Sequence, residues 1–174
     1  MSYVIRFTET QWTVMLSGLW ARDDVESAAI IRAEPLAGTN GTTLAVRDVT
    51  LVPDDAFKTR LADHIEVDAV WTNRACERAR RAGQAVITVH THLSTAPAWF
   101  SWADDRGDDR LLPAIAVQTR GAPPGSMNVT LTDATARVLV RGQRLPARIT
   151  VTGRRLAAYP SPVDRAEHEE GDGG

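Results

Sequence analysis

Cysteine and long apolar runs are the scarcest features of this 174-residue sequence. A single cysteine, Cys76, can form neither an internal disulfide nor a zinc site built from several thiolates. No stretch approaches the ~20 consecutive apolar residues of a membrane-spanning helix, and residues 1–12 lack the apolar core of a signal peptide. These absences predict a cytoplasmic protein without a membrane partner, and they leave histidine and carboxylate as the ligands for a metal.

An excess of basic residues is also missing. The chain has 20 Lys and Arg against 22 Asp and Glu, a net charge of -2, and Lys58 is its only lysine. Nucleic-acid-binding domains normally carry a clear positive excess gathered on one face, so we expect no nucleic-acid partner. With 43% hydrophobic and 24% charged residues, the composition is that of an ordinary globular protein, and the length suits one domain.

Apolar periodicity and turn signals predict the order of the elements. A strand over 3–7 is followed by a helix that ends near Trp20, and Thr8 and Gln11 are spaced for a capping box at its start. A second helix over 68–82 begins at a possible Asp68 cap and ends before Gly83. Further strands are expected where β-branched and apolar residues cluster, at 25–33, 43–52, 84–92, 111–119, 126–132, 136–141 and 148–152.

This order of elements predicts one α/β domain over residues 1–158, with a mixed sheet and helices packed on it. The segments 25–33 and 43–52 are expected to pair as a hairpin, and 84–92 is expected to be a central strand. Residues 159–174 are polar, acidic and glycine-rich, so they are predicted to be a disordered tail.

Two histidines at the end of the strand expected over 84–92 carry the clearest chemical signal. His90 and His92 are two positions apart, so on a strand both imidazoles point to the same face. Ser101 and Asp104 follow an eight-residue loop and share one face if a helical turn begins there. Two histidines and a carboxylate are typical of catalytic zinc, which keeps a fourth position for a water whose pKa falls to about 7.

A zinc hydrolase also needs a proton-transfer group that is not a metal ligand. Glu26 is the preferred candidate because it lies in an apolar strand segment, where burial should raise the pKa of its carboxyl. Glu34 is the alternative, although Pro35 places it at a turn. Ser101 suits hydrogen bonding to the oxyanion of a tetrahedral intermediate, and a plain helix N-cap is the rival role for its side chain.

Other interpretations of the same residues stay open. The two histidines also fit a strand pair satisfied by hydrogen bonds, and Asp104 fits a carboxylate placed at a helix N-terminus. Asp105 is an alternative metal ligand. Three aromatic residues flank the motif: Trp99, Phe100 and Trp102. At least one of them is expected in the core, and one beside the metal could also line a groove for an extended peptide bound as an added strand.

Glu26, His90-Thr91-His92 and Ser101-x-x-Asp104 together resemble the signature of the JAMM/MPN (JAB domain) metalloprotease family, and the chain looks like a compact bacterial member. The resemblance spans roughly residues 1–120. It implies an MPN/JAB-like fold, a mixed β-sheet flanked by helices with layering similar to cytidine deaminases. It also implies one Zn²⁺ per chain on His90, His92 and Asp104, with Glu26 as general acid/base and Ser101 as oxyanion stabiliser.

The resemblance further implies a substrate and partners. It points to an isopeptidase or peptidase that cleaves the amide bond after the C-terminal tail of a ubiquitin-like protein or its conjugates, with a companion protein from a conjugation operon as a further partner. Two other functions stay open: a non-catalytic MPN scaffold that binds a partner protein, and a zinc hydrolase of a small amide. Such scaffolds usually lack one or more metal ligands, and this chain keeps all three.

Overall fold

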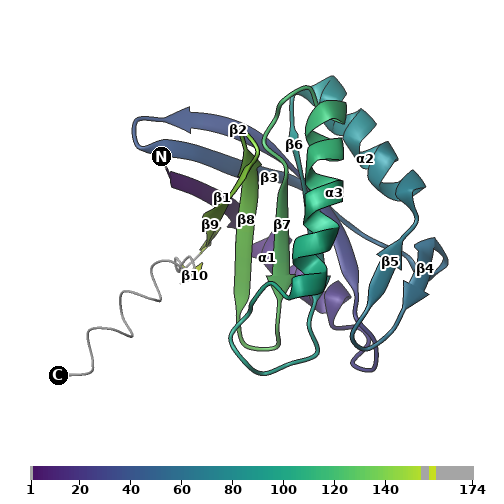
Figure 1. The fold of residues 1–174 in the computed structure, drawn as a ribbon. Helices are drawn as coiled ribbons and strands as arrows, with labels where there is room; N and C mark the ends of the chain where they lie inside the picture. The colour runs from purple at the N-terminus through teal and green to yellow at the C-terminus, as the bar shows by residue number, and fades with distance from the viewer. Residues whose placement is uncertain (1, 154–156, 160–174) are drawn as a thin grey trace.

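The protein is described by a computed structural model that covers residues 2–153 and 157–159 (Figure 1). Its helices are α1 (Glu9–Leu19), α2 (Ala69–Ala82) and α3 (Trp102–Gln118), with a 3-10 turn η1 at Asp54–Ala56. Its strands are β1 (Ser2–Thr8), β2 (Ala28–Gly38), β3 (Gly41–Leu51), β4 (Phe57–Arg60), β5 (Ile65–Val67), β6 (Ala85–Thr91), β7 (Gly125–Val129), β8 (Ala134–Val140), β9 (Gln143–Thr152) and β10 (Ala157–Tyr159). Apart from Tyr159, the predicted tail over 159–174 lies outside the described residues.

A closed sheet forms the centre of the described structure. Its strands run in the order β1-β3-β2-β6-β7-β8-β9, and β9 pairs again with β1 to complete a barrel of seven strands. β1 is parallel to both of its neighbours, β3 and β9, whereas β2 is antiparallel to β3 and β6. β4 and β5 form a separate two-stranded sheet.

The main core fills the inside of the closed sheet. Alternate residues of the strands point inward, because successive side chains of a strand lie on opposite faces. Fully buried members from different strands include Ile5, Phe7, Ile31, Leu44, Ile87, Met127 and Ile149, and α1 adds Trp12, Met15 and Leu19. α1 begins at the predicted capping box, in which the Gln11 backbone N–H donates to Thr8 Oγ1 (3.2 Å) and the Thr8 N–H to Gln11 Oε1 (2.9 Å).

A smaller core lies under α2 and α3, which cover the outer face of the closed sheet on the same side in Figure 1. The outward residues of β2 and β6 meet α2 there, while α3 packs over β7 and β8. This core contains Ala28, Ile30, Val86, the buried thiol Cys76, Ala79 and Ile115. None of the described helices is long and apolar enough to cross a membrane.

The predicted fold class, an α/β MPN/JAB-like domain with a mixed sheet flanked by helices, is wrong. The sheet closes on itself through the β1–β9 pairing, where Tyr3 lies opposite Ala147, and it contains the main core inside instead of burying both faces under helices. The sequence pattern identifies strands by their period of two, but it does not identify the partner of each strand edge. Closure depends on contacts between segments at opposite ends of the described chain, which no local pattern reports.

One predicted strand is a helix. Residues 111–119 were expected to be extended, but α3 continues through them to Gln118. The buried residues Leu112, Ile115 and Thr119 recur at spacings of three and four, which is a helical face. Pro113 obscures that pattern because a proline inside a helix removes a hydrogen bond and disfavours the turn before it.

The other local predictions are confirmed with shifted ends. The Asp68 side chain accepts from the Val70 N–H (2.8 Å) at the start of α2, and Gly83 ends the helix with φ 64°, a left-handed conformation that favours glycine. β2 and β3 pair as the expected hairpin, and β6 lies between β2 and β7. β2 begins at Ala28, three residues later than expected, so Glu26 lies in the loop before the strand.

Candidate metal centre

The end of β6 positions the two histidines. Thr91, between them, is fully buried and its Oγ1 accepts from the Ser27 backbone N–H (2.8 Å), while the Thr91 N–H donates to the Ser27 carbonyl (2.9 Å). The His92 N–H donates to the Val129 carbonyl on β7 (2.9 Å). Backbone hydrogen bonds on both sides therefore hold His90 and His92 on a rigid part of the sheet, with both imidazoles facing the N-terminus of α3.

The first turn of α3 positions the carboxylate. Ser101 is the N-cap, with φ −72° and ψ 168°, and its Oγ accepts from the Asp104 backbone N–H (3.1 Å). In return, Asp104 Oδ2 accepts from the Ser101 N–H (2.6 Å). This reciprocal pair confirms the predicted helical turn and places a negative charge at the positive end of the helix dipole. The N-cap role of Ser101 is thus present, and it uses the hydroxyl oxygen as an acceptor.

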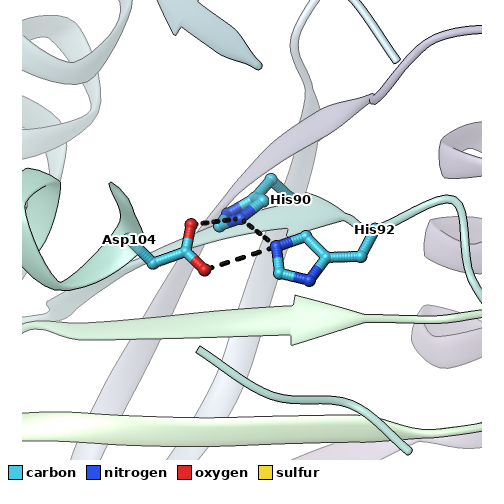
Figure 2. Close-up of side chains that lie close together, drawn as sticks. All are labelled: His90, His92 and Asp104. Atoms are coloured by element: carbon cyan, nitrogen blue, oxygen red, sulfur yellow. Dashed lines mark hydrogen bonds and ion pairs between the residues drawn. The ribbon is translucent and has the colours of Figure 1, made fainter. Parts of the chain in front are cut away.

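Three ligand-type atoms converge at this point, as Figure 2 shows. His90 Nε2 lies 2.9 Å from Asp104 Oδ1, His92 Nε2 lies 3.3 Å from Asp104 Oδ2, and the two Nε2 atoms lie 3.1 Å apart. Ligands at about 2.0–2.1 Å from a tetrahedral zinc ion lie about 3.3–3.4 Å from one another. The two Nε2 atoms are close to that spacing, and each imidazole contacts one of the two Asp104 carboxylate oxygens. One ligand atom from each residue lies within 4.8 Å of the other two, so His90, His92 and Asp104 form a group that could hold a metal ion.

The electrostatics of the site favour an ionised Asp104. Burial acts to raise the pKa of its carboxyl, but hydrogen bonds with His90 and His92, the charge of His90 and the Ser101 backbone N–H outweigh burial and hold the pKa well below its ordinary value. An ionised carboxylate beside two imidazoles is the form that binds a divalent cation.

Glu26 lies in the same cavity without belonging to the ligand group. Its side chain is buried, and its backbone is held by a hydrogen bond from its N–H to the Leu61 carbonyl and by one from Arg60 Nε to its own carbonyl, both 2.8 Å. Burial raises the pKa of its carboxyl, against the opposing effect of the charges of His90 and His92. The structure therefore brings Glu26, His90, His92, Ser101 and Asp104 to one cavity.

The alternative residues are placed elsewhere. Glu34 forms an ion pair with Arg47 and does not line the cavity. Asp105 Oδ1 pairs with Nη1 of Arg137 (2.5 Å) and of Arg144 (2.9 Å), so this carboxylate is directed away from the histidines. Neither residue belongs to the group that could hold a metal.

The aromatic residues around the motif divide between surface and site. The Trp99 ring packs edge-on against the His92 ring, with centroids 4.8 Å apart, although 44% of Trp99 is exposed. Trp102 is 72% exposed and lies beside the Arg106 guanidinium. Phe100 lines the cavity and packs under Arg137. None of the three belongs to either hydrophobic core of the described residues.

Asn128 is a site residue that sequence reasoning missed. It is fully buried on β7, directly opposite His90 in the parallel β6–β7 register. Its Nδ2 donates to Asp104 Oδ2 (2.9 Å) and to the Trp99 carbonyl (2.7 Å). A buried asparagine that fixes a ligand carboxylate is a typical outer partner of a metal site. No sequence signal identifies it, because its neighbours become known only once β6 and β7 are paired.

An ion-pair cluster anchors α3 to the closed sheet behind the ligand group. Arg137 on β8 contacts Asp108 Oδ2 through Nε (2.8 Å) and Nη2 (2.7 Å), and its guanidinium lies 3.7 Å from the centroid of the Phe100 ring. The Ser126 hydroxyl also donates to the Asp108 carboxylate. Asp108 lies one helical turn after Asp104, so this cluster holds the helix that carries the metal-ligand candidate.

Comparisons with known proteins bear on the fold and leave the site open. No family model matches the sequence, and no curated protein matches it. The structure is similar to the solution structure of a protein from Desulfitobacterium hafniense, with a TM-score of 0.55 over 87% of this chain and 94% of that one, at 12% identity. At that identity the likeness concerns the fold alone.

Proposed function

We propose that the protein is a zinc-dependent hydrolase of amide bonds that uses a JAMM-type motif. One observation carries this proposal: two imidazole nitrogens and a carboxylate converge within 4.8 Å of one another in a cavity that also holds a separate buried carboxylate, Glu26. Nitrogen and oxygen ligands in a three-residue set, with one position left for water, are the typical arrangement of catalytic zinc.

Each side chain has a defined part in this proposal. His90, His92 and Asp104 would hold the zinc ion, which when bound polarises the substrate carbonyl and acidifies water. Glu26 accepts a proton from the attacking water and transfers it to the amide nitrogen that leaves. Its burial suits this exchange, because a raised pKa brings the carboxyl closer to the working pH. The Ser101 hydroxyl donates a hydrogen bond to the carbonyl oxygen as negative charge develops on it.

The proposed substrate is the amide bond after the C-terminal tail of a ubiquitin-like protein or its conjugates, by the resemblance of the motif to the JAMM family. β5 supports an extended substrate, since it lines the cavity and has one edge unpaired within the described sheets. An extended peptide binds such an edge by adding a strand. A companion protein from a conjugation operon, the cytoplasmic location and the lack of nucleic-acid and membrane partners stay predictions.

A zinc hydrolase of small amides is the second candidate. The cavity has a volume of about 490 Å³, which is within the range of small-molecule sites. Activity on small amides, with none on conjugates of ubiquitin-like proteins, would favour this candidate.

Metal content and one carboxylate substitution test the proposal. We expect about one zinc per chain in the wild-type protein by elemental analysis and little in His92→Ala purified in parallel. Glu26→Gln should keep zinc and lose amide cleavage, whereas Glu34→Gln, a matched change of a carboxylate outside the cavity, should keep both. A wild-type protein that takes up no zinc on titration would refute the hydrolase and leave a partner-binding scaffold. Normal cleavage by Glu26→Gln would refute the role of Glu26.

A further inference from the structure

The cavity at the candidate metal centre extends well beyond the reacting groups, between α2 and α3. On its floor, Ala28 and His90 are paired across β2 and β6, and the next outward pair along the strands is Ile30 with Thr88. The α3 wall is a stripe at spacings of three and four, made of Ala103, Gly107, Leu111, Ala114 and Gln118. The opposite wall comes from α2, β5 and the residue after β3, with Val52, Ile65, Val67, Ala69, Thr72 and Asn73.

At the far end of the cavity, a hydrogen bond joins the two helices. Gln118 Nε2 donates to Asn73 Oδ1 (3.0 Å), which links the last turn of α3 to α2. Asp104 and Gln118 both line the cavity and are 14 positions apart on the helix, which corresponds to roughly 21 Å at 1.5 Å per residue. The cavity is therefore elongated, with the metal centre at one end.

The lining has a marked charge pattern. Its carboxylates are Glu26, Asp63, Glu66, Asp104 and Asp108, and among the described residues that line it there is no arginine or lysine. A lining with carboxylates and no lysine or arginine disfavours the binding of anionic groups such as carboxylate or phosphate. The stretch between the metal centre and Gln118 is walled mainly by aliphatic side chains, which favour burial of apolar surface.

The floor also restricts how a ligand lies in the cavity. β2 is paired with β3 and β6, and β6 is paired with β2 and β7, so neither floor strand offers a free edge for an added strand. The space over Ile30 and Thr88 therefore suits a side chain or an acyl chain, which needs no backbone hydrogen bonds.

We propose that this cavity binds an uncharged aliphatic group attached to the amide that is cleaved. The inference rests on the proposed function and deepens it, because it gives the chemical class of substrate at the same site. A peptide side chain and the acyl chain of a small amide share this chemistry.

Gly107 offers a way to fill the cavity without damaging the fold. A Cβ added at Gly107 meets no atom within 4 Å, so the space beside this position is open. Leucine is a better helix former than glycine, so Gly107→Leu should not lower the thermal stability. Val117→Leu is the matched control, since Val117 is 80% exposed on the same helix and does not line the cavity.

Binding of methyl ketones of increasing chain length tests the inference, because they are uncharged and are not hydrolysed. We expect the affinity of 2-butanone, 2-hexanone and 2-octanone, measured by calorimetry, to rise about fourfold for each added methylene, both in zinc-loaded and in chelator-treated protein. The rise should persist in Val117→Leu and be lost in Gly107→Leu. Ala114→Leu, on the same cavity wall, provides a second narrowing variant if Gly107→Leu melts at a lower temperature than the wild type.

The outcomes separate this inference from the proposed function. The aliphatic site would be overturned if the ketone affinity of the wild type did not rise with chain length, or if it rose equally in both narrowing variants. This holds even if zinc-dependent amide cleavage is observed. If the ketone affinity rises with chain length, the narrowing variants abolish that rise and the protein binds no zinc, the aliphatic site is supported and the hydrolase is refuted. Where zinc-dependent cleavage is observed, cleavage of the anilides of N-acetyl-leucine and of hexanoic acid distinguishes a peptide side chain from an acyl chain.

Discussion

Replacing Arg137 with methionine tests how the closed sheet holds the helix that carries Asp104. The Arg137 side chain is 11% exposed. Its Nε donates a hydrogen bond to Asp108 Oδ2 and its Nη2 forms an ion pair with the same oxygen, while Asp108 as a residue is 7% exposed. In Arg137→Met, Asp108 keeps only the Ser126 hydroxyl as a partner among the contacts described here. A buried charge left without its ion-pair partner costs about 3–5 kcal/mol, so the free energy of unfolding should fall by about that amount.

The double variant Arg137→Met with Asp108→Leu isolates the cause. It removes both charges and leaves apolar groups of similar volume, a change that is often neutral for buried ion pairs. We therefore expect it to recover most of the stability that Arg137→Met loses. Asp105 keeps Arg144 as a partner in both variants, so its contribution should cancel in the comparison.

Denaturation by urea at pH 7, on protein treated with a chelator, measures these differences without a contribution from bound metal. A loss below about 1 kcal/mol for Arg137→Met would show that Asp108 is solvated, because that is the size of an exposed ion pair. A double variant as unstable as the single one would show that packing of Arg137 on Phe100, instead of charge pairing, holds α3 to the sheet.

Three further predictions concern the site. Because burial raises the pKa of Glu26, the protonated carboxyl contributes its full stability below the unfolded pKa, and this contribution is lost as the pH rises through the folded pKa. Metal-free Glu26→Gln should therefore have a higher free energy of unfolding than the wild type at pH 7.5 but not at pH 4. The same difference in free energy at both pH values would contradict the burial of this carboxyl. Asn128→Leu should weaken zinc binding about 10- to 100-fold in a chelator competition, through loss of its hydrogen bond to Asp104, and an unchanged affinity would exclude this positioning role. Ser101→Ala and Thr8→Ala each remove a helix cap, so each should lower the free energy of unfolding by about 1 kcal/mol. Only Ser101→Ala should lower kcat, by about 100-fold or more. Equal kcat values for the two variants would leave Ser101 with the capping role alone.

Features that depend on a few neighbouring residues could be predicted from the sequence. The capping box of Thr8 and Gln11, the Asp68 cap and the left-handed Gly83 are all present. The group that could hold a metal ion could be predicted for the same reason. Side chains two apart on a strand share a face, and a serine three residues before an aspartate caps a helical turn, so each half of the motif is arranged by its own backbone.

Only the tertiary structure decided how these local pieces meet. A strand pattern specifies which face is buried but leaves the partner strand open, so the closure of β1 on β9 was missed and the predicted fold class was wrong. Asn128 reaches Asp104 because β7 pairs with β6. Glu26 lies in the same cavity as the histidines because the neighbouring Ser27 is hydrogen-bonded to Thr91. The helix through Pro113 is stabilised by burying Leu112 and Ile115, contacts between distant segments that outweigh the local cost of the proline.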